Sequence, residues 1–201
     1  QFKSQIEFEF DKKLIKFEKI FCTSTPRRIV LLLEGLVDKG EDEMIIRKGP
    51  KASSAFINGT PTKAAVGFAN SLGIDVDDLE IENTEKGGFV FGKKVRKGES
   101  TRISLSLIIP KVIKSLQGPR FMKWGNGNFK FSRPIRWLVS IYNDEILDFD
   151  LDECDPKIVV GNLSKSHRLI NRVIKINSPD NYFEILAENG VLVKREERKE
   201  K

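Results

Sequence analysis

Apolar residues recur along the chain at two spacings, and each spacing predicts a different kind of element. A spacing of three and four residues, as on one face of a helix, occurs in residues 2–17, 64–72 and 105–116. Branched, aromatic or alternating apolar residues, which are typical of strands, occur in residues 27–36, 44–50 and 89–95. We therefore expect helices packed on sheets, with the strand over residues 27–36 buried.

Turn-forming residues predict where the helices begin and end. Thr60 fits the N-cap of the second helix, Pro61 its first position, and Gly73 a left-handed C-cap. Pro110 falls inside the third helical pattern, where a proline removes a hydrogen bond and clashes with the preceding turn. We expect that helix to be kinked or broken at Pro110.

The second half of the chain adds a hairpin and a last helix. Strand-like segments on both sides of Asn143-Asp144 predict a β-hairpin over residues 136–151. A helix is expected after Ser178-Pro179-Asp180, ending at Gly190. The predicted fold class is α+β, with mixed or antiparallel sheets and packed helices.

With 201 residues and 39% hydrophobic content, the chain can bury a core as one large domain or two small lobes. The expected division is an amino-terminal α+β lobe at 1–99 and a basic α+β lobe with the hairpin at 100–193. Residues 194–201 would begin a linker or helix to a next domain. The two lobes could also form one intertwined domain. Because the chain starts at Gln1 and finishes in a charged run, we expect it to be part of a longer protein.

Charge is distributed unevenly along the sequence. The formal net charge is +6, and no Asp or Glu occurs between Ser100 and Asn143. A soluble surface usually mixes its signs, so an acid-free run of this length suggests a surface kept positive for a polyanion. The cations of this run are Arg102, Lys111, Lys114, Arg120, Lys123, Lys130, Arg133 and Arg136. Residues 157–178 form a second acid-free run, which contains Lys165, His167 and Arg168.

Aromatic rings alternate with cations in residues 118–137, around the turn Gly125-Asn126-Gly127. Unpaired RNA bases stack on such rings and on Arg planes, while cations hold the phosphates. The alternative is that the rings belong to the core, as large apolar side chains usually do. We expect Trp124 to be exposed beside the small turn residues, and Trp137 to lie in the core.

The sequence contains no recognisable catalytic constellation. His167, the one histidine, has no Ser, Cys or Asp at a familiar spacing, and Cys22 and Cys154 form no CxxC pair. Acidic residues cluster within 144–155, where they could bind a metal, but their alternation with apolar residues fits the solvated face of an edge strand better. We therefore expect no metal site and no catalytic residue. The absence of a membrane-length apolar run and of a secretory leader, with only two cysteines, favours a cytoplasmic protein.

Several short motifs together give the chain a resemblance to a known family. In order they are Thr25-Pro26-Arg27-Arg28, Arg47-Lys48-Gly49-Pro50, Pro61-Thr62-Lys63-Ala64-Ala65 with Gly67-Phe68-Ala69, Met122-Lys123-Trp124-Gly125, Arg133-Pro134-Ile135-Arg136-Trp137-Leu138, His167-Arg168, and Glu196-Glu197-Arg198-Lys199. This order and spacing resemble the amino-terminal part of the beta subunit of bacterial heterotetrameric glycyl-tRNA synthetase. The chain departs from the family pattern at Ser166, where many relatives have a glycine.

The resemblance implies a role within a larger enzyme. Two alpha and two beta subunits would charge tRNA(Gly), with ATP, Mg²⁺ and the adenylate chemistry in the alpha subunit. This part of the beta subunit would be a non-catalytic, B3/B4-like accessory module without a cofactor of its own. Its partners would be tRNA(Gly), the alpha subunit and a second beta subunit. The alternative is a protein-interaction module that docks on the alpha subunit or on other beta domains without touching tRNA.

Twelve residues are the RNA-binding candidates. The main group comprises Arg120, Lys123, Trp124, Arg133, Arg136, Lys165, His167 and Arg168, and the secondary group comprises Arg27, Arg28, Arg47 and Lys48. For His167, a purely structural role is an equal alternative.

Overall fold

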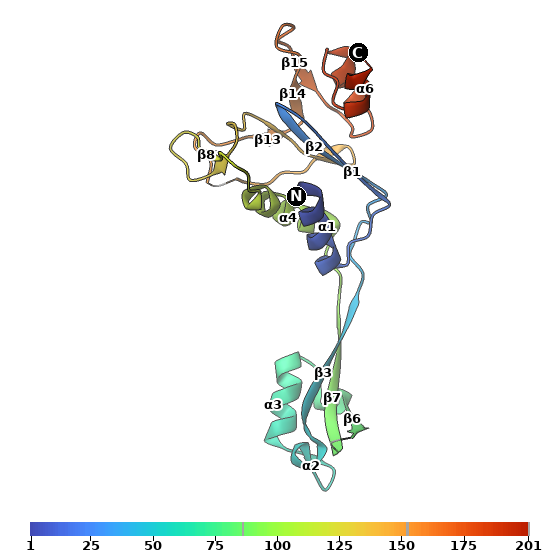
Figure 1. Cartoon of the computed structure of the whole chain (residues 1–201). Coiled ribbons are helices and arrows are strands. Elements are labelled where there is room, and N and C mark those ends of the chain that lie inside the picture. The colour runs from blue at the N-terminus through green and yellow to red at the C-terminus, as the bar shows by residue number, and fades with distance from the viewer. Residues whose placement is uncertain (86, 152, 201) are drawn as a thin grey trace. The chain divides into compact units, whose positions relative to one another are not determined.

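The structure is a computed structural model that describes residues 1–85, 87–151 and 153–200. It divides into two compact units (Figure 1). The main unit comprises residues 1–40 and 99–201, and the inserted unit comprises residues 41–98. The expected lobes share the boundary near residue 99 but assign residues 1–40 differently. Residues 1–40 pack with the second half of the chain because the first helix buries its apolar face there.

The inserted unit is a three-stranded antiparallel sheet with helices on one face. Its strand order is β3 (Glu43–Lys51), β7 (Gly87–Arg96) and β6 (Leu79–Thr84). The shorter elements are α2 (Ala52–Ala55), β4 (Phe56–Ile57), β5 (Thr60–Pro61) and η1 (Val76–Asp78). Helix α3 (Lys63–Leu72) contributes Ala65 to the core formed with Ala55 and Val90. Its small residues let the helix approach the sheet closely.

The cap of α3 differs from the expected one by two residues. Thr62 is the N-cap, and its hydroxyl accepts a hydrogen bond from the Ala64 N–H at 3.3 Å. Pro61 pairs with Phe56 in the short β4–β5 hairpin, so Thr60 precedes the helix rather than capping it. The predicted C-cap is confirmed, since Gly73 has φ +65° in the left-handed region.

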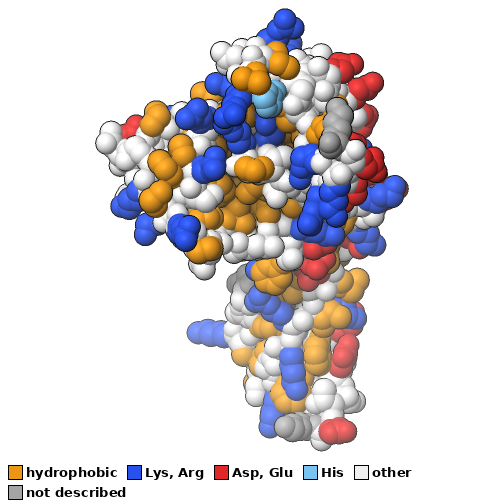
Figure 2. All heavy atoms as spheres, turned by 45° about the horizontal axis from the view of Figure 1, so that its top comes forward, with side chains coloured by type: hydrophobic (Ala, Val, Ile, Leu, Met, Phe, Trp, Pro, Cys, Tyr) orange, Lys and Arg blue, Asp and Glu red, His pale blue; other side chains and the backbone are white. Residues whose placement is uncertain are grey.

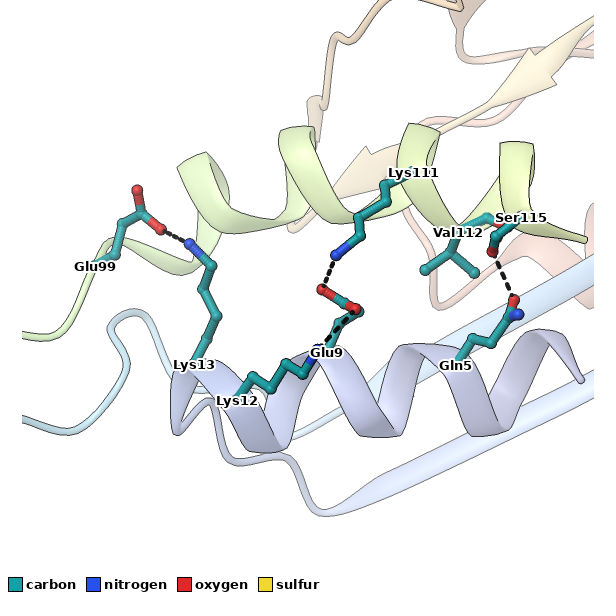
Figure 3. A network of polar contacts seen from close by, with 8 residues as sticks. All are labelled: Gln5, Glu9, Lys12, Lys13, Glu99, Lys111, Val112 and Ser115. Atoms are coloured by element: carbon teal, nitrogen blue, oxygen red, sulfur yellow. Dashed lines mark hydrogen bonds and ion pairs between the residues drawn. The ribbon is translucent and has the colours of Figure 1, made fainter.

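Two helices form the centre of the main unit. Helix α1 (Phe2–Lys13) packs against α4 (Thr101–Ser115) through Ile6, Phe10 and Ile108. Polar contacts flank this core, including the hydrogen bond from Ser115 Oγ to Gln5 Oε1 at 3.0 Å (Figure 3). Helix α4 continues through Pro110, so the alternative of a broken helix is wrong. Pro110 is partly exposed, and water can therefore satisfy the carbonyl group that it leaves without a donor.

A hairpin follows α1 where one buried strand was expected. Strand β1 (Lys19–Thr25) pairs antiparallel with β2 (Arg28–Glu34), in register from Lys19–Glu34 to Thr25–Arg28. Only Val30 of β2 is buried, and most of the strand is half-exposed, so the expectation of a buried strand is wrong. A two-stranded sheet cannot cover both of its faces.

The rest of the main unit consists of very short strands and two short helices. The strands are β8 (Met122–Lys123), β9 (Lys130–Phe131), β10 (Leu138–Val139), β11 (Ile141–Tyr142), β12 (Glu145–Ile146), β13 (Val160–Gly161), β14 (Leu163–Lys165) and β15 (Val173–Lys175). The helices are α5 (Tyr182–Glu188) and α6 (Arg195–Lys199). The predicted hairpin at Asn143 exists, but it pairs only β11 with β12. Its neighbour β10 instead pairs in parallel with β13.

The α+β class is confirmed by this mixture of packed helices and small, mainly antiparallel sheets. Within the described ranges, no helix is both long and apolar enough to cross a membrane.

Candidate nucleic-acid interface

Ion pairs neutralise part of the acid-free run at residues 100–143. Three of its cations lie on α4 and pair with acids from other elements of the main unit. Arg102 contacts Glu145 at 2.6 Å, and Lys114 contacts Glu153 at 3.6 Å. Lys111 contacts Glu9 of α1 at 2.8 Å (Figure 3). The absence of acids in the sequence therefore does not make the helical part of this run a positive surface.

The cations of the same run that follow α4 are exposed and are not paired with described acids. Arg120, Arg133 and Arg136 are exposed, and none of them forms an ion pair with a described residue. Lys123 is also exposed, and its ammonium donates to the Asn128 side chain at 2.8 Å rather than to a carboxylate. The unneutralised charge of the run is thus concentrated in residues 120–136.

Close backbone contact holds this cationic segment in place. The turn of the β8–β9 hairpin lies against residues 153–155, where Asn126 N donates to Asp155 O at 3.2 Å and Asn128 N to Glu153 O at 2.9 Å. Gly125 has φ +72°, and a side chain there would overlap the Asp155 carbonyl oxygen. The glycines of this turn therefore allow the hairpin backbone to pack directly against the backbone of residues 153–155.

The two tryptophans do not lie as expected. Trp124 is half-buried rather than exposed, because its Nε1 donates to Phe131 O at 2.9 Å across the β8–β9 hairpin. Trp137 is also half-buried, but none of the described hydrophobic cores includes it. Its ring has Arg28 at 5.6 Å and Lys165 at 5.7 Å from the centroid. Of the two tryptophan rings, Trp137 is therefore the one with described cations beside it.

Arg28 joins three elements at this ring. Its guanidinium lies by Trp137, and its Nη2 donates to the Lys165 carbonyl oxygen of β14. Burial lowers the pKa of Arg28, while the nearby Tyr182 raises it and Arg27 lowers it further. Burial also raises the pKa of Tyr182. Arg28 thus has a packing role that its exposed neighbour Arg27 lacks. The sequence gave no indication that Arg28 and Arg27 would differ in this way. It also gave no indication that Tyr182 would lie near Arg28.

His167 and Arg168 lie in the loop between β14 and β15, and both are exposed. The buried Ser166 closes this loop, since its Oγ accepts from Arg172 N at 2.7 Å. The backbone of His167 donates to Asn189 O at 3.1 Å, which attaches the loop to the end of α5. The Ser166 side chain therefore makes a hydrogen bond that closes the turn.

Arg47 and Lys48 belong to the inserted unit and form a separate group. Both are exposed on β3, and the Lys48 ammonium lies 3.5 Å from the centroid of the Phe89 ring. By sequence, the inserted unit has nine basic and nine acidic residues, so the main unit carries the whole net charge of +6. In the view of Figure 2, several Lys and Arg side chains lie near the histidine of the main unit, whereas the acids of this unit lie mainly along one edge.

The acidic block at residues 144–155 serves in ion pairs. Glu145 and Glu153 pair with α4, and Asp150 pairs with Lys157 at 2.7 Å. Among residues 1–85, 87–151 and 153–200, no group of three or more His, Cys, Asp or Glu residues could hold a metal ion. Asp152, which belongs to the block, lies outside the described residues.

Fold and site together define an α+β module with an exposed cationic segment. A family model described as "Glycyl-tRNA synthetase beta subunit" matches residues 1–201. The chain belongs to this family. It is 39% identical over 202 residues to the glycine–tRNA ligase beta subunit of Trichodesmium erythraeum. This alignment covers 100% of the chain and 28% of that relative.

Other relatives match a similar share of their own length. The glycine–tRNA ligase beta subunit of Clostridioides difficile is 37% identical over 100% of the chain and 29% of the relative. That of Dictyoglomus thermophilum is 34% identical over 94% of the chain and 27% of the relative. The chain thus spans about 28% of the length of the first of these relatives.

Proposed function

We propose that this chain is a non-catalytic portion of a glycine–tRNA ligase beta subunit that holds tRNA(Gly) through its phosphate backbone. The ligase would assemble from alpha and beta subunits in the cytoplasm. ATP and Mg²⁺ would be bound by the alpha subunit, and the fold of this chain would be of the B3/B4 kind.

One observation carries the proposal. Arg120, Arg133 and Arg136 remain exposed without an ion pair among the described residues, in the unit that holds the whole net charge. The three cations on α4 in the same acid-free run, Arg102, Lys111 and Lys114, pair with acids instead. Exposed cations without acidic partners are available to phosphates, and phosphate contacts supply most of the non-specific affinity for nucleic acid.

Charge reversal at Arg133 and Arg136 tests the proposal in the assembled enzyme. The double variant Arg133→Glu/Arg136→Glu should bind tRNA(Gly) more weakly. The slope of log affinity against log salt should flatten by about one unit per lost phosphate contact. Filter binding across a salt series measures both quantities.

The matched control makes the same change of charge in the inserted unit. Lys63→Glu/Lys97→Glu also reverses two exposed cations, and it should leave the salt slope within error of the parent. An unchanged slope in a folded Arg133/Arg136 variant would reject the proposal.

A second function is favoured by exposed apolar residues near the β14–β15 loop. Leu169 is 83% exposed, Val173 66% and Leu163 52%, and all three belong to the β14–β15 hairpin. Apolar side chains gathered on a surface mark protein interaction sites, and here the partner would be the alpha subunit or another beta domain. In that case the Arg133/Arg136 variant would lose affinity for the alpha subunit and keep its affinity for tRNA.

A further inference from the structure

A pocket lies where the β8–β9 hairpin docks on residues 153–158 of the main unit. Its volume is about 340 Å³. The lining residues come from the hairpin, from residues 134–136 and from residues 154–158, and include Trp124, Phe129, Pro134, Arg136, Cys154 and Ile158. Two of the motifs that carry the family resemblance, Met122–Gly125 and Arg133–Leu138, therefore meet at this one concavity.

The walls of the pocket are fixed by the packing of its backbone. Gly125 and Gly127 lie directly against the main chain of residues 153–155, where a Cβ atom on either glycine would overlap carbonyl groups. The hydrogen bond from Trp124 to Phe131 O holds the indole on the hairpin side. The pocket therefore depends on this docking and is partly preformed.

The lining combines buried apolar residues with exposed charged ones. Phe129 and Ile158 are each 8% exposed and are its buried apolar members. Arg136, Lys157 and Asp155 are its exposed charged residues. Lys157 is paired with Asp150, whereas Arg136 has no ion pair with a described residue. A ligand that fits this arrangement has a flat apolar part and an anionic group next to it.

We propose that the pocket receives one unpaired nucleobase of the bound RNA, with the adjoining phosphate held by Arg136. This inference rests on the proposed function and deepens it. Unpaired bases are the parts of an RNA that proteins take up among aromatic and apolar side chains, while cations hold the neighbouring phosphate. The volume is at the lower end of the range of small-ligand sites, roughly 300–1,000 Å³, which suits a single base.

The rate at which Cys154 is alkylated can report whether the pocket is occupied. Cys154 lines the pocket and lies in the tryptic peptide of residues 137–157, whereas the exposed Cys22 lies in that of residues 20–27. Burial raises the pKa of the Cys154 thiol, so alkylation requires mildly alkaline buffer with and without RNA. Mass spectrometry of the two peptides gives both rates in one sample of the assembled enzyme.

The expected result is selective protection of Cys154. With tRNA(Gly) at about 100 times its Kd, alkylation of Cys154 should slow at least about tenfold, since reaction then requires the RNA-free enzyme. Cys22 should change much less. A fully paired RNA helix, which has no unpaired base to insert, should leave Cys154 unprotected. Equal protection by the paired helix would contradict base insertion.

A pocket-filling variant gives an independent measurement. Cys154→Phe should occupy the space of the base and weaken tRNA binding, while the salt slope should flatten by at most about one unit, because only the phosphate next to the displaced base can lose its contact with Arg136. Cys154→Ala keeps the pocket open and should bind like the parent. A thermal melt of both variants checks that the fold is intact.

The outcomes of these experiments distinguish a failure of the pocket inference from a failure of the proposed function. If Cys154 stays reactive and Cys154→Phe binds normally, while the Arg133/Arg136 variant loses its salt slope, the pocket inference fails and the function stands. If tRNA affinity does not respond to Arg133 and Arg136 either, the proposed function fails. Protection of Cys154 by the alpha subunit without RNA would assign the pocket to a protein side chain and overturn the inference.

Discussion

Two adjacent arginines show how far identical side chains can differ in role. Arg27 is exposed at the turn between β1 and β2, whereas the next residue, Arg28, is partly buried between Trp137, Tyr182 and the Lys165 carbonyl group. The sequence places both at the same strand entrance, so composition cannot distinguish them. The difference arises because Arg27 lies in the turn, outside both strands, whereas Arg28 is the first residue of β2 and pairs with Thr25.

Arg28→Ala should destabilise the chain by about 1–2 kcal/mol, since it removes a cation–π contact and a hydrogen bond to a carbonyl group. Arg27→Ala is the matched control, and it should change the free energy of unfolding by less than about 0.5 kcal/mol. Urea denaturation of both variants measures the difference. Equal effects would mean that Arg28 has no packing role.

Gly125→Ala should cost more than about 2 kcal/mol, because it combines an unfavourable left-handed φ with an overlap at the Asp155 carbonyl group. Gly67→Ala is the control. Gly67 lies within α3, and a Cβ atom added there would meet no heavy atom within 4 Å, so alanine should stabilise by about 0.5–1 kcal/mol. Thermal melting distinguishes the two directions, and a neutral Gly125→Ala would contradict the docking of the hairpin.

Among the elements, those that bury one regular face were predictable and those defined by distant partners were not. The three- and four-residue spacing predicted α1, α3 and α4 because each helix packs one apolar face on a core. Strands such as β10 and β13 are only two residues long, and they exist because chain segments about twenty residues apart meet in parallel. No local pattern encodes such a pairing, so the long hairpin strands expected around Asn143 did not form.

The contact between α1 and α4 should make stability depend on pH. Lys13 and the Ser104 hydroxyl both donate to Glu99, and these hydrogen bonds lower the pKa of the Glu99 carboxyl group. A lowered folded-state pKa contributes stability above the unfolded value of about 4.3, and this is lost as the pH falls through the folded value. Glu99→Gln should therefore be less stable than the parent at pH 7, with the difference shrinking at acidic pH.

The size of the Glu99 effect should be at most about 1 kcal/mol, because solvent screens an ion pair this exposed. Urea denaturation between neutral and acidic pH measures it, and Glu188→Gln, an exposed residue of α5, is the control. A difference that stays constant with pH would show that ionisation of Glu99 is not its source.

At the scale of the whole molecule, the division into units decides which cations act together. The motif order suggested that Arg47 and Lys48 belong with the other candidates, but they lie in a unit with no net charge. Local periodicity could not reveal this insertion, since the contact that closes the main unit joins residues 40 and 99. The candidate residues read from the sequence alone therefore come from two different units.

The main unit should fold and bind RNA without the inserted unit. Its two ends are joined by the hydrogen bonds from Gly40 N to Glu99 O at 3.0 Å and from Thr101 N to Asp38 O at 2.9 Å. A turn of about two to four residues can therefore replace residues 41–98. Because Arg120, Arg133 and Arg136 remain, the shortened beta subunit should keep the parent's salt slope for tRNA(Gly). Cooperative urea unfolding with a flattened slope would instead mean that Arg47 and Lys48 supply phosphate contacts.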